Sequence, residues 1–376
     1  MRYKTTKVSK YLDQIRNVQE RNVLLLGISG TGKSNLLGKL INSNIKVKEP
    51  FILFDFDGNL SEKTEHSMKL SNYDKYYAED LEKSVSFYLD KNVLEGNVYD
   101  LVLGIIELVN KLLDPEKKGL VGPKCEKGID VITRTLVEVG KFDLYKAFWL
   151  LYDLDNGGKE VRKYLDSPKL KHYKEALEKL LQERTGGEFH IDYLNYVEEK
   201  MFKKVDSPYI KKLLTYPYKK SVRDTFKKGR SLILDFSKQK TDEEVSIILG
   251  NLFMLAVLLT LRTRQPGKNY VIYINGLQNI SSRTFSSLMM ESRPLKITII
   301  PTLEYLQQIN RDEIDAILGN TAALILFKTN DYDADFLEGY FNYKGLAKQL
   351  PKLKKGQAIL VSRLPGKEIK QRVNVV

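Results

Sequence analysis

Short, unbroken apolar runs mark the first part of the chain. Residues 23–26 (VLLL) and 50–56 (PFILFDF) are such runs, residues 35–40 between them continue as a helix, and residues 10–19 favour a short helix in a polar lead-in. Unbroken apolar runs of this length are typical of strands that are buried on both faces. The order strand, helix, strand therefore predicts the opening unit of a parallel sheet.

The apolar pattern changes to a helical period between residues 74 and 228. Two stripes at helical spacing are clearest, at Leu101, Ile105, Leu108 and Val109 and at Ile129, Ile132, Leu136 and Val139. Proline and glycine residues interrupt the pattern repeatedly, which separates it into several helices. We therefore predict an all-α insertion at residues 74–228.

Strand-like apolar runs return after this insertion. They lie at residues 231–236, 270–274, 297–300, 322–328 and 358–362. An apolar helix is predicted between the first two runs, at residues 242–261. Its longest apolar stretch is broken by Gly250 and Asn251 and is too short to span a bilayer, so a buried helix is favoured over a membrane span. The pattern predicts one α/β domain, 1–73 plus 229–376, with a mainly parallel sheet.

The loop after the first strand carries a recognisable motif. Residues 27–34 (GISGTGKS) fill every fixed position of the P-loop pattern GxxxxGK[ST]. Its glycines permit a backbone that turns successive N–H groups inward, which forms an anion cradle at a helix N-terminus. Lys33 can reach the β- and γ-phosphates, and the Ser34 hydroxyl can ligate Mg²⁺. The alternative is a glycine-rich turn that binds nothing.

This motif predicts ATP and Mg²⁺ as cofactors. The residues predicted to bind the nucleotide are Gly27, Ser29, Gly30, Thr31, Gly32, Lys33, Ser34 and Asn35.

Composition excludes several other classes of protein. The single cysteine, Cys125, excludes a disulfide scaffold and a multi-cysteine zinc site, and the three histidines are scattered along the chain. The first residues lack the apolar core of a signal peptide. We therefore expect a cytoplasmic protein.

The positive charge is concentrated in two segments. The chain has a net charge of +13, while residues 211–230 and 344–376 carry +7 and +8. Clustered basic residues are the pattern expected of a surface that contacts phosphate backbones. The alternative is a solvated surface in a lysine-rich protein. We predict DNA as a partner.

Several stretches together resemble one family, the FtsK/HerA superfamily of DNA-pumping ATPases, and especially the TraD/TraG-type coupling ATPases of conjugation. The similar stretches are FDFDGNLSE at 54–62, the segment at 122–151, GRSLILDFSKQKTDEEVSIILGNLF at 229–253, ESR at 291–293 and ILGNTAALILFKTNDYDADFL at 317–337. The resemblance covers nearly the whole chain. It implies a RecA-like P-loop NTPase core that assembles as a ring, expected to be a hexamer, around DNA.

The chain departs from this family where its acids are expected. A P-loop motor normally ends one apolar strand in Asp-Glu, where the aspartate holds the Mg²⁺ water shell and the glutamate polarises the attacking water. The matching strand, 270–274, ends in Asn275 and Gly276. Asparagine can still bond a metal-bound water, but glycine supplies no base. The sensor glutamine of the family falls on Glu304.

The resemblance assigns roles to further residues. It places Asp55 and Asp57 beside the P-loop, where either could act on water or metal, and it matches Arg293 to an arginine that reaches a neighbour's nucleotide across a ring interface. A surface ion pair is the alternative for Arg293. We predict Lys33, Asp55, Asp57, Arg293 and Glu304 as catalytic residues and Ser34 and Asn275 as metal ligands.

The sequence thus predicts a DNA translocase subunit of the conjugation or packaging type, encoded on a mobile genetic element. A relaxosome, capsid or membrane protein is a possible further partner, since no direct membrane span is predicted. Two alternatives remain open because the acids at 275 and 276 are missing. One is a nucleotide-binding assembly or regulatory module that hydrolyses little or no ATP, and the other is a structural DNA-binding partner of an active motor.

Overall fold

The structure is a computed structural model that describes residues 6–7, 22–69, 72–77, 80–114, 119, 121–185, 199, 201–237, 242–264, 269–280, 282–309, 311–364 and 367–375. The helix predicted at residues 10–19 lies outside this part of the chain. The chain divides into two compact units. The sheet unit comprises Met1–Val85, Val222–Gly250 and Arg264–Val376, and the helical unit comprises Ser86–Ser221 and Asn251–Thr263.

A sheet of ten strands forms the centre of the sheet unit. In spatial order the strands are β1 (Thr6–Lys7), β12 (Lys367–Asn374), β11 (Gln357–Leu364), β10 (Thr321–Leu326), β2 (Asn22–Leu26), β9 (Ile297–Leu303), β8 (Tyr270–Asn275), β3 (Phe51–Asp55), β7 (Ser231–Asp235) and β4 (Tyr73–Tyr76). Only the pairs β10–β11 and β11–β12 are antiparallel. The predicted α/β fold with a mainly parallel sheet is confirmed.

Three described strands at the sheet margins escaped the apolar pattern, and the shortest of them, β1, has only two polar residues, TK. β12 reads KEIKQRVN, and its alternation of polar and apolar residues fits an outer antiparallel strand. β4 reads YDKY, and its buried Asp74 receives an ion pair from Arg230 at 3.1 Å. The predicted start of the insertion, residue 74, therefore falls inside a strand of the sheet.

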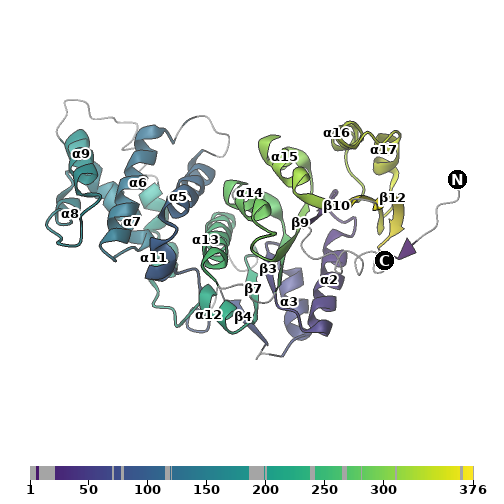
Figure 1. Cartoon of the computed structure of the whole chain (residues 1–376), viewed down its shortest axis with the longest axis horizontal. Helices are drawn as coiled ribbons and strands as arrows, with labels where there is room; N and C mark the ends of the chain where they lie inside the picture. The colour runs from purple at the N-terminus through teal and green to yellow at the C-terminus, as the bar shows by residue number, and fades with distance from the viewer. Residues whose placement is uncertain are drawn as a thin grey trace. The chain divides into compact units, whose positions relative to one another are not determined.

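Helices cover both faces of this sheet, with α2 and α3 on one face and α14 and α15 on the other (Figure 1). The helices of the sheet unit are α2 (Lys33–Val47), α3 (Asn59–His66), α12 (Val222–Lys227), α14 (Ser282–Met290), α15 (Arg311–Gly319), α16 (Asp331–Phe341) and α17 (Leu346–Gln349), with short 3-10 turns at Leu277–Asn279, Leu306–Gln308 and Leu350–Lys352. Alternate residues of β2 and β3, such as Val23 and Leu53, pack with Leu37 of α2 in one fully buried core. This burial fixes α2 beneath the strand that carries its loop.

The strand order determines where a ligand can bind. β9 lies between β2 and β8, and β3 lies on the far side of β8. All four strands are parallel, so their carboxyl ends lie at one edge of the sheet. Ligands of open α/β sheets bind at this edge. The P-loop and the predicted acids are therefore brought together there.

The helical unit contains the predicted insertion helices. They are α4 (Lys91–Glu95), α5 (Val98–Leu113), α6 (Pro123–Glu138), α7 (Leu144–Asp155), α8 (Lys159–Arg162), α9 (Lys174–Thr185) and α11 (Pro208–Thr215), and two-residue strands β5 (Val85–Ser86) and β6 (Lys220–Ser221) flank them. Both predicted stripes are buried, since Ile105 of α5 and Leu136 of α6 are 1% and 0% exposed. The stripes face inward because a helical period places these residues on one side of each helix.

The long helix α13 (Glu243–Thr263) is divided between the two units: its residues up to Gly250 belong to the sheet unit and Asn251–Thr263 to the helical unit. It is longer than its apolar run suggested, and by length and composition alone it could cross a membrane. However, 89% of its most apolar window is buried inside the protein, which identifies it as a core helix. Gly250 allows this burial in the sheet unit, because a Cβ there would lie 2.5 Å from the Phe56 ring.

Candidate functional site

The P-loop connects β2 to α2 and is held by both strands that flank β2. The Gly27 N–H donates to the Leu303 carbonyl of β9 at 3.1 Å, and the Ile28 N–H donates to the Lys328 carbonyl beyond β10 at 2.9 Å. Gly27 has a φ of 154°, and a Cβ at this position would lie 2.6 Å from the Phe327 Cβ. No other residue type fits there, so the loop has one path out of the sheet.

Lys33 begins α2 and is 7% exposed. Its ammonium donates to the carbonyl oxygens of Gly27 and Ile28, the second at 3.0 Å. Burial lowers the pKa of Lys33, while the nearby carboxylates of Glu304 and Asp57 oppose this shift. The lysine is thus folded back over the loop, with its ammonium held by two loop carbonyls and near enough to Glu304 and Asp57 to be influenced by their charges.

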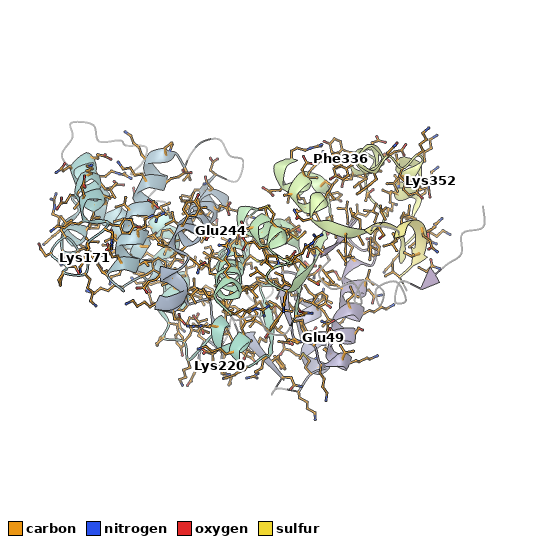
Figure 2. All side chains as sticks on the ribbon, in the orientation of Figure 1. Glu49, Lys171, Lys220, Glu244, Phe336 and Lys352 are labelled. Atoms are coloured by element: carbon orange, nitrogen blue, oxygen red, sulfur yellow. The ribbon has the colours of Figure 1, made fainter. Side chains whose placement is uncertain are left out.

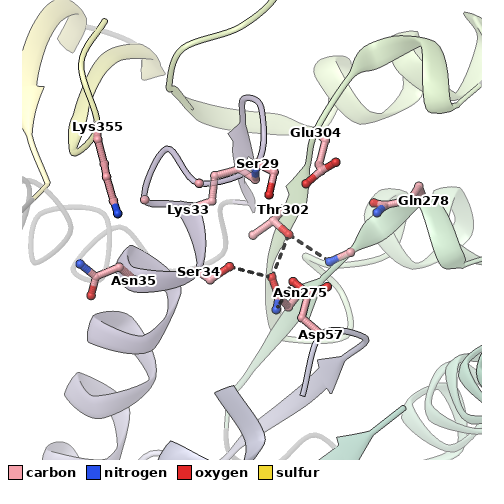
Figure 3. A pocket seen from close by; sticks show the side chains of 13 residues that line it. Ser29, Lys33, Ser34, Asn35, Asp57, Asn275, Gln278, Thr302, Glu304 and Lys355 are labelled. Carbon is pink, nitrogen blue, oxygen red and sulfur yellow. Dashed lines mark hydrogen bonds between the residues drawn. The ribbon is translucent and has the colours of Figure 1, made fainter. Parts of the chain in front are cut away.

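A cavity of about 240 Å³ opens over the P-loop (Figure 3). It is lined by Ser29, Gly30, Gly32, Lys33, Ser34, Asn35, Asp57, Asn275, Gly276, Gln278, Thr302, Glu304 and Lys355. All of these residues belong to the sheet unit. Six of the eight residues predicted to bind nucleotide therefore meet at one cavity. The other two shape the loop: Gly27 fits between strands, and the buried Thr31 hydroxyl donates to the Ile28 carbonyl at 2.8 Å.

Asn275, at the end of β8, is the centre of a hydrogen-bond network. Its Oδ1 accepts from the hydroxyls of Ser34 and Thr302, both at 3.3 Å. Its Nδ2 donates to Asp55 Oδ1 at 2.9 Å and to Asp57 Oδ2 at 3.0 Å. The amide of Asn275 thus accepts from two hydroxyls and donates to two carboxylates. Through these bonds Asn275 connects the P-loop helix with β3 and β9.

Asp55 does not line the cavity. It is 0% exposed, and its Oδ2 accepts from the backbone N–H groups of Leu60 and Ser61 at 2.9 and 2.8 Å. A carboxylate in this place satisfies otherwise unpaired N–H groups at the first turn of α3. Asp55 therefore holds Asn275 and α3 in place and does not reach the cavity. Its predicted catalytic role would require direct contact with a ligand, which this position does not offer.

Asp57 and Glu304 do line the cavity, from opposite sides of Asn275 (Figure 3). Desolvation raises the pKa of Asp57, the charge of Asp55 raises it further, and the bond from Asn275 opposes both. Glu304 directly follows β9 and shares the cavity wall with Thr302 two residues earlier, as the alternation of a strand requires.

Arg293 lies apart from this cavity, in the exposed turn that follows α14. Its predicted action on a neighbour's nucleotide stays a prediction, since the structure holds one chain.

Three lining residues were missed by the sequence reading: Gln278, Thr302 and Lys355. Lys355 belongs to the basic segment 344–376, and the turn that carries it is tied to the P-loop, because the Gly356 N–H donates to the Thr31 carbonyl at 2.9 Å. The excess of positive charge in that segment was visible, but not its contact with a loop more than three hundred residues earlier.

The residues at the cavity fit Mg²⁺. They supply oxygen donors, namely the hydroxyls of Ser34 and Thr302, the amide oxygen of Asn275 and the carboxylates of Asp57 and Glu304. Among the described residues, no group of three or more His, Cys, Asp or Glu could hold a metal ion by itself. This donor set suits an ion that keeps several waters and binds through phosphates and one or two carboxylates.

Comparisons with known proteins agree with this geometry. Residues 2–117 match the family model "Helicase HerA, central domain". Over the whole chain, the structure is similar to the unbound bacterial conjugative coupling protein TrwBdeltaN70, with a TM-score of 0.67 and 13% identity, covering 100% of this chain and 94% of TrwB. The chain has the fold of the FtsK/HerA-type P-loop ATPases. The predicted resemblance to these ATPases, close to the TraD/TraG type, is confirmed at this level.

Two further structures share the FtsK/HerA-type fold. TrwB in complex with the ATP analogue ADPNP gives a TM-score of 0.66 at 13% identity, with 100% and 94% coverage of the two chains. VirB4 of Thermoanaerobacter pseudethanolicus gives 0.53 at 14% identity, with 94% and 89% coverage. No curated protein matches the sequence significantly. The likeness at such low identities concerns the fold.

Proposed function

We propose that the chain is an ATP-hydrolysing subunit of a DNA translocase of the conjugation or packaging type. One observation carries this proposal: a single cavity joins the P-loop residues Lys33 and Ser34 with the strand-end carboxylates of Asp57 and Glu304. Phosphate-binding groups and acids are thereby arranged around one space, as phosphoryl transfer to water requires.

Different residues of the cavity bind the phosphates, hold the metal ion and orient the attacking water. The backbone N–H groups of residues 29–34 and the N-terminus of α2 bind the phosphates, and Lys33 leaves the carbonyls of Gly27 and Ile28 to reach the β- and γ-phosphates. The Ser34 hydroxyl would hold Mg²⁺, which would neutralise part of the phosphate charge. We assign the orientation of the attacking water to Glu304, which lines the same cavity. TrwB, of the same fold, has been solved with ADPNP and with ADP and Mg²⁺.

The two units suggest a division between motor and insertion. We assign ATP binding to the sheet unit, near the predicted domain 1–73 plus 229–376, and regard the helical unit as the insertion predicted at 74–228. We assign the protein to the cytoplasm. Arg293 would complete the site of a neighbouring subunit in a ring, with a hexamer as the expected form.

Both basic segments offer exposed lysines for DNA. Figure 2 shows Lys352 of the sheet unit and Lys220 of the helical unit extending outward from the ribbon, and both side chains are exposed. If such lysines contact phosphates, the affinity for DNA falls steeply with salt. An affinity that does not change with salt concentration would remove DNA backbone contact from the proposal.

The first experiment measures steady-state phosphate release with and without DNA. DNA-stimulated release by the wild type is expected to fall to background in Lys33→Ala. Lys46→Ala is the matched control, because Lys46 is an exposed lysine in the last turn of the same helix. Release that survives in Lys33→Ala would contradict the proposed site.

A second function is favoured by Asn275 and Gly276, which replace the usual acids. In this alternative the protein binds ATP for assembly or regulation and hydrolyses little of it. Tight, Lys33-dependent ATP binding without turnover would support it. Mixed rings with an active homologue would then show whether the chain serves as a structural partner of a working motor.

A further inference from the structure

The carboxylate that is missing from β8 is present on the neighbouring strand. β3 and β8 are parallel, and Asn275 is the register partner of Asp55. Asp57 follows two residues later and lines the cavity, where its Oδ2 accepts from Asn275 Nδ2. A carboxylate is therefore present at the cavity beyond the end of β3, one strand further from the P-loop than Asn275.

The bonds of Asn275 explain why an amide occupies this position. Both hydrogens of its Nδ2 are directed at carboxylates, at 2.9 Å to Asp55 and 3.0 Å to Asp57. An aspartate at 275 would have no N–H to donate and would place a third carboxylate against these two. Like charges at this distance force one of the group to take up a proton, and the buried acceptors would lose their donor.

We propose that Asp57 replaces the missing strand-end aspartate and acts on the Mg²⁺ water shell, and that Asn275 is the positioning residue that holds it. Ser34 supports this assignment. Its hydroxyl donates to Asn275 Oδ1, so the side chain of Asn275 links Ser34 to Asp57. The carboxylate of Asp55 is occupied by the first turn of α3, whereas Asp57, in the bend that directly follows β3, lines the cavity. This inference rests on the proposed nucleotide site.

A charge-swap cycle tests the assignment, with three variants: Asp57→Asn, Asn275→Asp and the double variant Asp57→Asn/Asn275→Asp. Asp57→Asn is expected to weaken the Mg²⁺-dependent part of ADPNP binding by about tenfold, as the loss of a metal-site carboxylate does. Asn275→Asp alone gives no gain in Mg²⁺-dependent affinity or in turnover. The double variant recovers part of the Mg²⁺-dependent affinity, because one acid and one amide again face each other.

A second readout needs no nucleotide. The melting temperature of the ligand-free protein is expected to fall in Asn275→Asp and to rise again when Asp57→Asn is added, because the crowded carboxylates are relieved. Asp335→Asn is the matched control, since Asp335 is an exposed acid within α16, outside the first turn of that helix and outside the cavity. Its change from carboxylate to amide should alter neither readout.

Three results would overturn the proposal. One is a rise in Mg²⁺-dependent affinity or turnover in Asn275→Asp, which would show a lost rather than a relocated acid. The second is an Asp57→Asn variant that binds like the control, and the third is strictly additive melting temperatures in the cycle. Failure of the wild type to bind ADPNP through Lys33 would instead contradict the proposed function, and the ligand-free cycle would still test the role of Asn275.

Discussion

The two sides of the cavity are built in different ways. Apart from Lys355, the P-loop side comes from one continuous segment, residues 27–35, in which the motif fixes Gly27, Gly32, Lys33 and Ser34. The acid side is assembled from the ends of β3, β8 and β9, and Asn275 bonds to Asp55 across 220 positions of sequence. The first side can be identified from spacing, whereas the second depends on which strands lie next to each other.

This contrast indicates which positions of the cavity tolerate a change of residue type. A phosphate cradle made of backbone N–H groups fixes glycine and lysine at given positions. A set of strand-end side chains only has to present suitable groups to a shared space, so a charge can move between neighbouring strands.

Gly27→Ala should damage the P-loop side most. The added Cβ would lie 2.6 Å from the Phe327 Cβ at a φ of 154°, which we expect to cost about 3 kcal/mol of folding free energy and to abolish ATP binding. Urea denaturation and ADPNP titration measure the two effects. Gly140→Ala is the control, because its φ is also positive but no atom lies within 4 Å, so only about 1 kcal/mol is expected.

Thr302→Val should damage the acid side. Its hydroxyl donates to Asn275 Oδ1 at 3.3 Å and accepts from the Gly276 N–H at 3.0 Å, so valine leaves a buried N–H without its acceptor. We expect a loss of about 2 kcal/mol in folding free energy and a clear fall in phosphate release. Thr302→Ser keeps the hydroxyl and should retain most of both. Equal losses in the two variants would mean that packing, not the network, matters here.

Lys355→Ala tests the lysine that joins the P-loop side from the C-terminal segment. Lys355 lines the cavity and its neighbour Gly356 bonds to Thr31, so its ammonium is placed to attract the nucleotide phosphates. We expect affinity for ATP and ADP to weaken by about three- to tenfold at low salt. Lys354→Ala removes an adjacent exposed lysine that does not line the cavity. Indistinguishable affinities in the two variants would remove Lys355 from the site.

Asp333→Asn should have the smallest effect on folding stability. It tests the cost of burying a carboxylate that has few hydrogen-bond donors. Asp333 is 0% exposed, and its Oδ2 accepts from the Leu306 N–H at 3.1 Å. Burial raises the pKa of Asp333, although that bond opposes the shift. A raised folded-state pKa means that folding stability falls as pH rises through it, because the unfolded state releases the proton first.

The asparagine variant removes this cost. Its melting temperature should exceed that of the wild type by about 1 to 2 °C at neutral pH and match it below pH 3, where the acid is protonated in both states. A gain that does not depend on pH would show that charge is not its cause.

Much of the architecture was predictable because each element has a local pattern. β2, β3, β7 and β8 are unbroken apolar runs, and the helices of the insertion carry regular stripes. The marginal strands β1, β4 and β12 were missed because strands with polar residues and few apolar neighbours do not stand out in sequence. Likewise, Asp55 and Asp57 are both aspartates, two positions apart, so the sequence does not distinguish their roles. In the structure Asp55 bonds to the first turn of α3, whereas Asp57 lines the cavity.

A P-loop on a parallel sheet could be predicted from the amino-acid sequence, because glycine, lysine and serine at fixed spacing are required by a turn made within one segment. Only the folded chain shows which carboxylates line the cavity, that Asn275 bonds two acids, and that Lys355 lines the cavity beside the P-loop. These contacts join residues that are far apart in the chain, and they depend on the order of strands in the sheet, which no local pattern contains.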